Sequence, residues 1–173
     1  YWFITPKITY SLTHYNDIKH ARAEIDKSST RSLPIYSLDT GLIFERNSTV
    51  FGRETEQTLE PRLFYAYIPY RNQRHMPNFD SSSADLNFAE LFTPNKYTGF
   101  DRIANTNQLS AVLTTRYIDS GTGKEWFSAT VGQRYYFTDE KVDLYWSNPG
   151  KTKNRSDVLA ASQFSLFEGW RLE

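Results

Sequence analysis

Residues 57–70 (QTLEPRLFYAYIPY) alternate between two kinds of side chain, and this alternation constrains the fold more than any other feature. In an extended strand, Leu59 and Leu63 fall on one face, whereas Glu60 and Arg62 fall on the other. A helix repeats every 3.6 residues and would mix the two sets, so the segment is predicted to be a β-strand. Two settings fit such a strand. One is a half-buried strand of a soluble sheet, and the other is a barrel strand with lipid on one side and water on the other.

The same period recurs along the chain, which predicts an all-β fold. We expect an antiparallel up-and-down meander of six to seven strands, with a seventh strand beginning at Trp170 after a turn at 167–169. The sixth strand is the least regular: Val158, Ala160 and Phe164 lie on its expected apolar face, but the opposite face also carries the apolar Leu159 and Ala161. The six predicted strands are 2–15, 33–46, 57–70, 107–118, 126–137 and 156–166.

The connections between these strands alternate in length. Long polar loops of about 17, 35 and 18 residues alternate with turns of about 10, 7 and 3 residues, the first turn being 47–56. Outer-membrane barrels have this asymmetry, with long loops outside and short turns in the periplasm. The pattern therefore favours part of a large transmembrane outer-membrane β-barrel, and a soluble β domain remains the alternative. The predicted extracellular loops are 16–32, 71–106 and 138–155.

Composition narrows the classes of function. Lys plus Arg and Asp plus Glu are both 20, so the net charge is zero, which argues against a nucleic-acid-binding module. No apolar run reaches the length of a transmembrane helix. The chain starts at Tyr1 without a methionine and stops within an alternating stretch, so we expect a segment of a longer protein. Aromatic residues at predicted strand ends would form an interfacial girdle; they are Tyr65, Tyr67, Tyr117, Tyr135 and Phe137.

The loop 71–106 is unusually long for a compact domain, which predicts a function or a local fold of its own. Its segment 84–92 (ADLNFAELF) predicts a short helix that is capped by Ser83 or Asp85 and ended by Pro94. We expect the loop to fold over or into the barrel as a cap. The residues expected to pack on the inner wall are Phe88, Leu91 and Phe92.

Seven blocks of sequence, in order, are similar to the C-terminal barrel of the LptD family of lipopolysaccharide-assembly proteins. The blocks are SLDTGLIFER (37–46), QTLEPRLFYAYIPYRNQ (57–73), NFDSS (78–82), FAELF (88–92), GFDRIANTNQLS (99–110), TTRYID (114–119) and VGQRYYF (131–137). The resemblance covers most of the chain and is strongest from 57 to 137. It is specific because the blocks keep their order and spacing.

The resemblance implies a non-enzymatic translocon in the cell outer membrane that transports and inserts lipopolysaccharide into the outer leaflet. Implied partners are lipopolysaccharide, outer-membrane lipid, an LptE-like plug lipoprotein inside the barrel, and an LptA-like periplasmic bridge that binds through a domain missing here. The segment resembles the middle of the barrel, so we expect the lateral gate and the family's structural cysteines to lie elsewhere. The alternatives are a general outer-membrane porin or substrate channel, and a soluble β-rich binding domain.

Charged residues of the polar faces are the candidate binding residues. We expect them to face the lumen, because a charge on the lipid face near the midplane costs about 2–4 kcal/mol. In the simplest interpretation they solvate a water-filled interior and pair with one another. In the functional one, arginine and lysine contact lipid phosphates or the plug. The candidates are Lys7, Glu60, Arg62, Arg116 and Arg134, with Arg102 as a further candidate in the loop cap.

Nothing in the sequence predicts catalysis, a cofactor or a metal site. The three histidines, His14, His20 and His75, lack ligand spacing. Two prolines lie inside predicted strands, Pro6 and Pro61, and proline cannot donate to a sheet ladder. We therefore expect a bulge or weakened pairing at both positions.

Overall fold

The computed structural model describes residues 1–16, 28–144, 153–167 and 170–172, which form one antiparallel sheet. The strand order is β1-β2-β4-β5-β6-β7-β8, and β3 pairs with β4 beyond the end of β2. The all-β antiparallel meander is confirmed. No helix among the described residues is long and apolar enough to cross a membrane. The strands are β1 (Trp2–Asn16), β2 (Ser28–Leu42), β3 (Phe44–Val50), β4 (Arg53–Ile68), β5 (Thr106–Asp119), β6 (Glu125–Tyr136), β7 (Leu159–Phe167) and β8 (Trp170–Leu172).

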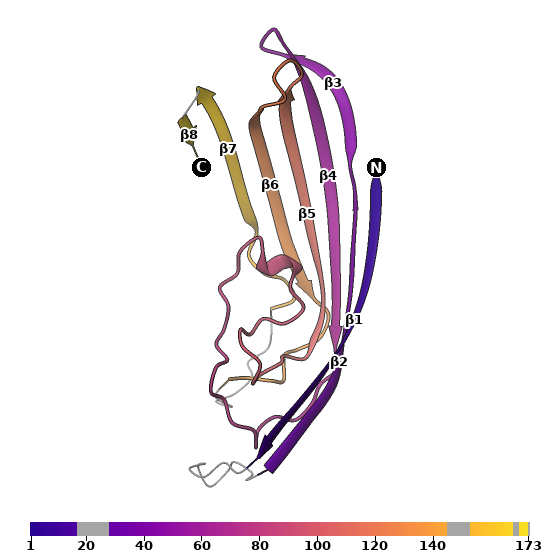
Figure 1. Cartoon of the computed structure of the whole chain (residues 1–173), viewed down its shortest axis with the longest axis vertical. Helices are drawn as coiled ribbons and strands as arrows, with labels where there is room; N and C mark the ends of the chain where they lie inside the picture. The colour runs from indigo at the N-terminus through magenta and orange to yellow at the C-terminus, as the bar shows by residue number, and fades with distance from the viewer. Residues whose placement is uncertain (17–27, 145–152, 168–169, 173) are drawn as a thin grey trace.

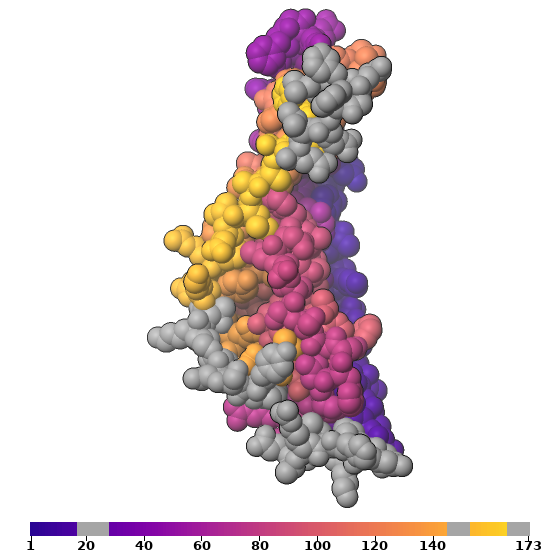
Figure 2. All heavy atoms as spheres, turned by 90° about the vertical axis from the view of Figure 1, so that its left-hand side faces the viewer, coloured from indigo at the N-terminus to yellow at the C-terminus, as the bar shows by residue number. Residues whose placement is uncertain are grey.

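The sheet has one end with short turns and one end from which long connections leave (Figure 1). The β3–β4 and β5–β6 turns lie at the first end, and the connections after β4 and β6 leave from the second. The sheet is bowed, and residues 69–105, which we call the covering loop, lie on its concave side (Figure 1). On this side the loop occupies the surface between β7 in yellow and β1 in indigo (Figure 2).

The two faces of the sheet differ in polarity. The covered face, called the polar face, carries Asp39, Glu60, Arg62, Arg116 and Arg134, and the register places these residues on alternate positions of adjoining strands. The opposite face, called the apolar face, has large side chains that stay exposed on the described part of the chain. They include Trp2, Ile4, Ile8, Leu59, Leu63, Tyr65, Leu113 and Val131.

The predicted strand 33–46 and turn 47–56 are wrong in their bounds. Extended chain begins at Ser28 and runs through β2 and β3 to Val50, and Phe51 and Gly52 alone turn it into β4. Their φ angles of 51° and 76° suit a two-residue hairpin turn with positive φ at both positions. Asn-Gly is the usual signal for this turn, and Phe51-Gly52 lacks it.

The other strand bounds differ from the prediction by a few residues. β4 starts four residues before the predicted 57, and β7 starts three residues after the predicted 156. Parts of three predicted connections lie outside the described residues: 17–27 of the loop 16–32, 145–152 of the loop 138–155, and 168–169 of the last turn.

The expected weak pairing is present at one proline and absent at the other. β2 pairs up to Gly41 opposite Arg62, and β3 resumes pairing at Phe44 opposite Leu59, so the ladder is interrupted opposite Pro61. Proline has no N–H to donate, which explains the interruption. The register of β1 is unbroken at Pro6. β1 is an edge strand of this sheet, and proline is tolerated in edge strands.

The predicted helix over 84–92 is wrong. Only Glu90–Phe92 is helical, as a single 3₁₀ turn, and the Asn87 side chain accepts the Glu90 amide at 2.9 Å. Upstream, the Ala84 amide bonds to the carbonyl of Lys96 at 3.0 Å. A helix of two turns is marginal by itself, because nucleation is costly. Here the loop backbone pairs with itself instead.

Gly52 of the β3–β4 turn and Gly121 of the β5–β6 turn supply a matched pair of substitutions. A Cβ at Gly52 would meet nothing within 4 Å, so Gly52→Ala tests the positive φ alone. We expect it to lower the free energy of unfolding of the full-length protein by about 1–2 kcal/mol, as measured by denaturant titration. Gly121→Ala, in the β5–β6 turn at ordinary φ, should change it by less than about 0.5 kcal/mol. Equal effects would contradict the assigned turn.

Candidate functional site: a loop fastened across the polar face

A buried arginine of β2 holds the covering loop at the end of the sheet with the long connections. The Arg31 residue is 2% exposed, and its guanidinium donates to the carbonyls of Phe100 and Asp101, both at 2.6 Å. It also donates to Gln73 Oε1 and to Thr13 Oγ1, both at 3.0 Å. The five N–H donors of a guanidinium lie in one plane, so one side chain binds loop backbone and strand together.

The Asp101 carboxylate makes a second set of hydrogen bonds that holds the covering loop to the sheet. It accepts hydrogen bonds from the Tyr15 hydroxyl of β1 and from the amides of Phe79 at 2.5 Å and Asp80 at 2.8 Å. Burial by itself raises the pKa of this carboxyl, but the hydrogen bonds from Tyr15 and from the two amides outweigh it and hold the pKa below its usual range. The carboxylate therefore stays ionised and joins two parts of the loop to β1.

The two halves of the loop are also joined to each other. The Ser81 hydroxyl accepts the amides of Asp101 at 3.0 Å and Arg102 at 2.9 Å. The Arg102 guanidinium donates to the carbonyls of Met76 at 2.7 Å and Pro77 at 2.9 Å. Burial lowers the pKa of Arg102, which is 3% exposed. Arg102, the candidate residue of the loop cap, therefore binds backbone carbonyls of the same loop.

The tip of the loop packs on the middle of the sheet. Leu91 is fully buried, and a Cβ added at Gly132 of β6 would lie 2.7 Å from its Cδ1 atom. The Phe92 ring stands edge-on to the Phe64 ring, with centroids 6.1 Å apart. The Arg134 guanidinium donates to the Glu90 carbonyl beside them. Apolar packing and one buried arginine thus hold the tip.

The remaining polar-face candidates form ion pairs. Arg62 donates to both oxygens of Asp39 at 2.9 and 2.5 Å and lies 3.8 Å from the centroid of the Phe92 ring. Arg116 bridges Glu60 at 3.0 Å and Glu125 at 2.9 Å. Lys7 is exposed and has no ion pair within the part of the chain that the structure describes. Four of the five candidates are therefore brought into contact with partners on this face.

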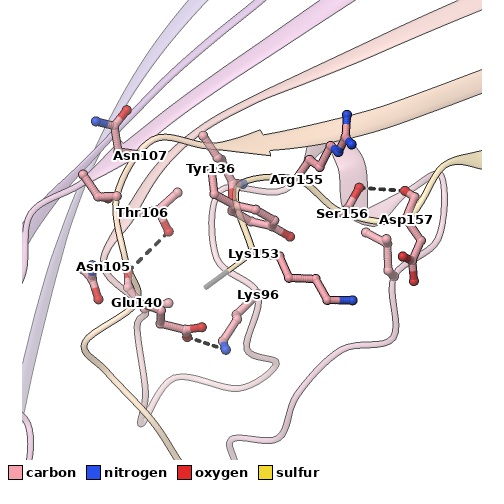
Figure 3. A pocket seen from close by; sticks show the side chains of 14 residues that line it. Lys96, Asn105, Thr106, Asn107, Tyr136, Glu140, Lys153, Arg155, Ser156 and Asp157 are labelled. Carbon is pink, nitrogen blue, oxygen red and sulfur yellow. Dashed lines mark hydrogen bonds and ion pairs between the residues drawn. The ribbon is translucent and has the colours of Figure 1, made fainter. Parts of the chain in front are cut away.

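A second contact joins the loop to residues 138–144. The Tyr97 hydroxyl donates to the Val142 carbonyl at 2.8 Å, and Lys96 pairs with Glu140. Beside them lies a pocket of about 340 Å³, where Lys96 turns to Glu140 and Arg155 turns toward β6 (Figure 3). Burial, together with the Glu140 carboxylate, raises the pKa of Tyr97, so its hydroxyl stays protonated as a donor.

Several fastening residues were not among the sequence candidates, namely Tyr15, Arg31, Gln73 and Asp101. The sequence predicts that Arg31 lies in the polar loop 16–32, and its partners in the covering loop lie 42 to 70 positions away along the chain. The available signal was the pair of blocks 78–82 and 99–110, which the structure brings together. Within the described ranges no group of three or more His, Cys, Asp or Glu is placed to hold a metal.

Asp101→Asn should loosen the covering loop without unfolding the sheet. An amide oxygen replaces two carboxylate oxygens and leaves a buried donor unpaired, which costs about 1–3 kcal/mol. We expect faster hydrogen exchange within 71–105 of the full-length protein and unchanged exchange in β4 and β5. Asp85→Asn removes an exposed carboxylate from the same loop and should leave exchange unchanged. Unaltered exchange in Asp101→Asn would contradict the fastening.

The same carboxylate makes loop docking depend on pH. Because the folded pKa of Asp101 is lowered, its contribution is complete above the ordinary aspartate pKa of about 3.9 and is lost as pH falls through the folded value. Pepsin cleavage within the covering loop should therefore rise as pH falls from 5 to 2. In Asp101→Asn, cleavage should be high throughout this range. A wild-type profile as flat as the variant's would count against the assignment.

Comparison with known proteins places the chain in a family. The model of the family described as "LptD: LPS transport system D" matches residues 1–173. Relatives named LPS-assembly protein LptD include that of Aromatoleum aromaticum, 49% identical over 160 residues, covering 92% of this chain and 20% of the relative. That of Paraburkholderia xenovorans is 43% identical over 177 residues, covering 99% and 22%. That of Thiobacillus denitrificans is 41% identical over 173 residues, covering 100% and 23%.

The chain thus spans about a fifth of the length of these relatives. The match extends over the strands and the covering loop alike, so it includes the fastening residues described above. The chain belongs to the LptD family.

Proposed function

We propose that this chain is part of an outer-membrane β-barrel that transports lipopolysaccharide and inserts it into the outer leaflet. The proposal rests on family membership and on the name of the relatives, LPS-assembly protein. The observation that carries it is the polarity of the two faces of the sheet. A barrel of this kind would do no bond chemistry, and we propose no enzymatic role for the chain.

The apolar face supports a lipid-facing position. A soluble sheet covers its apolar face with a second layer. Here the covering loop packs on the polar face, and Leu63, Leu113 and Val131 of three neighbouring strands stay 41–44% exposed. A contiguous exposed apolar surface of this kind marks a membrane or a protein partner. Across β4, β5 and β6 the middle of this face carries no charged residue.

Aromatic residues lie at two levels of the apolar face, as membrane interfaces require. Near the end with long connections, Tyr65 and Tyr135 flank Leu109 across three strands. Near the turns, Tyr117 packs on Phe127 with centroids 5.7 Å apart. About eight residues of β5, or about 26 Å, separate the levels, and outer-membrane barrels have an apolar band about 25 Å tall. The spacing supports one crossing per strand.

The covering loop would then lie inside the barrel and narrow its passage. The polar face beneath it carries paired charges, which would line a hydrated route for sugars while acyl chains leave at a gate elsewhere. The partners we propose are lipopolysaccharide, an LptE-like plug lipoprotein in the lumen, and an LptA-like bridge reached through a periplasmic domain. Membership of the family supports these partners, and the ion pairs of Arg62 and Arg116 offer the plug a polar wall.

Depletion of the full-length protein in its own cell tests the proposed function. Newly made lipopolysaccharide should stop reaching the surface and accumulate at the inner membrane or in the periplasm. Re-expression of the wild-type protein should restore surface delivery. Unchanged surface lipopolysaccharide with reduced uptake of small solutes would contradict the proposal and favour a porin or substrate channel.

A charge on the apolar face tests the membrane position. Leu113→Arg places an arginine near the middle of β5, and a lipid-facing arginine at this depth costs about 2–4 kcal/mol. We expect a marked loss of assembled, heat-modifiable barrel in outer-membrane fractions. Thr122→Arg, in the exposed β5–β6 turn, should assemble normally. Normal assembly of both variants would favour a soluble β domain, where an exposed Leu→Arg change is nearly neutral.

A further inference from the structure

We propose that the pocket between the tip of the covering loop and the polar face binds a single sugar ring of a passing saccharide. The inference rests on the proposed function and names the part of the substrate that this chain would contact. The pocket has a volume of about 430 Å³, within the usual range for small-molecule sites. Its wall includes Phe88 and Phe92 from the loop, Phe3 from β1, and Glu60, Arg62 and Arg116 from β4 and β5.

The charges of the pocket disfavour an anion. Its two guanidinium groups are already paired, Arg62 with Asp39, and Arg116 with Glu60 and Glu125. Each guanidinium thus already faces at least one carboxylate, so a phosphate would find no unpaired positive charge here. A phosphate site normally offers arginine in bidentate geometry with no competing carboxylate.

The same ion pairs disfavour an acyl chain. Arg116 and Glu60 are partly exposed on the pocket wall, at 42% and 25% of their side-chain surface. An acyl chain laid on this wall would strip water from charged groups without replacing their hydrogen bonds, which is costly. The rest of the lining is mostly apolar, so the pocket suits an uncharged occupant that has both an apolar face and hydrogen-bonding groups.

A pyranose ring has both properties that the wall requires. Its C–H groups form an apolar face that suits the negatively polarised face of an aromatic ring. One face of Phe92 is occupied by Arg62 at 3.8 Å, whereas the half-buried Phe88 makes no ring-to-ring contact within the described chain. The Phe3 ring has the Arg62 guanidinium 5.9 Å from its centroid, so Phe88 is the ring of this pocket that has neither a ring nor a cation against it within the described chain.

Hydrogen-bonding groups remain for the hydroxyls at the ring's edge. Three polar atoms of the wall have no hydrogen-bond partner among the described residues. Arg62 Nη1 and Arg116 Nη2 can donate, and Glu60 Oε2 can accept. The Thr114 and Thr130 hydroxyls lie 3.0 Å apart on the same wall. The guanidinium–carboxylate pairs therefore offer hydrogen bonds to the hydroxyls of an uncharged sugar, and the Phe88 ring offers it a stacking surface.

The test uses the full-length protein purified with its partners and a lipid-free core oligosaccharide released from lipopolysaccharide. Calorimetry gives the Kd for the wild type and for Phe88→Leu, Phe88→Tyr and Phe100→Leu. Phe88→Leu keeps an apolar side chain but loses the flat ring, and we expect the Kd to rise about fivefold. Phe88→Tyr should stay within about twofold, and so should Phe100→Leu, an exposed ring of the same loop.

Thr114→Val serves as a second variant on the sheet wall, independent of the loop. It removes one hydroxyl without a change of shape, and the Kd should rise about threefold or more. Inorganic phosphate added as a competitor should not displace the oligosaccharide. No binding to the wild type, displacement by phosphate, or wild-type affinity in both Phe88→Leu and Thr114→Val would overturn the inference. None of these results bears on surface delivery of lipopolysaccharide, whose persistence after depletion would reject the proposed function itself.

Discussion

The structure depends on the opposite polarity of the two faces of the sheet, and β4 shows this constraint most clearly. Because side chains alternate along a strand, Leu59 and Leu63 cannot share a face with Glu60 and Arg62. The pairing register gives β2, β5 and β6 the same division into a polar and an apolar face, because a shift of one residue would exchange the two faces. The covering loop packs only where polar groups are available to bind its backbone. Its position and the exposed apolar face are therefore two consequences of one pattern.

A loop of this length needs partners for its backbone groups, and buried polar side chains supply them. Arg31 binds the carbonyls of two loop residues, and Asp101 binds two loop amides. Unpaired buried groups are costly, so a network of this kind holds one conformation and loses it if a single member is removed. The apolar tip at Leu91 adds a second, separate contact with β6. The loop is thus bound to the sheet at two places, and Phe88 and Phe92 of the loop form one wall of the pocket.

Period-two alternation predicted most of the strands and their faces, although 47–50 belongs to β3 and not to a turn. It failed where local signals were absent or misleading. Phe51-Gly52 turns the chain without the usual Asn-Gly, and the segment 84–92 forms one turn because Ala84 pairs with Lys96. The candidate residues of the polar face followed from alternation, but Arg31, Asp101 and Tyr15 did not, since contacts between residues 70 and 86 positions apart leave no mark in local sequence. Only the ordered motif blocks indicated that 78–82 and 99–110 act together.

Alternate residues of β5 should meet lipid on one side of the sheet and the bound covering loop on the other. Single spin labels placed at each position from 109 to 116 of the full-length protein in lipid bilayers measure this directly. Accessibility to oxygen, which concentrates in the bilayer, should be high at 109, 111, 113 and 115. It should be low at Ser110 and Val112 on the polar face, which are buried beneath the covering loop. Accessibility to a water-soluble nickel complex should be low at both sets. Oxygen accessibility without a period of two, or high nickel accessibility at 111 and 113, would show that this face of β5 does not meet lipid.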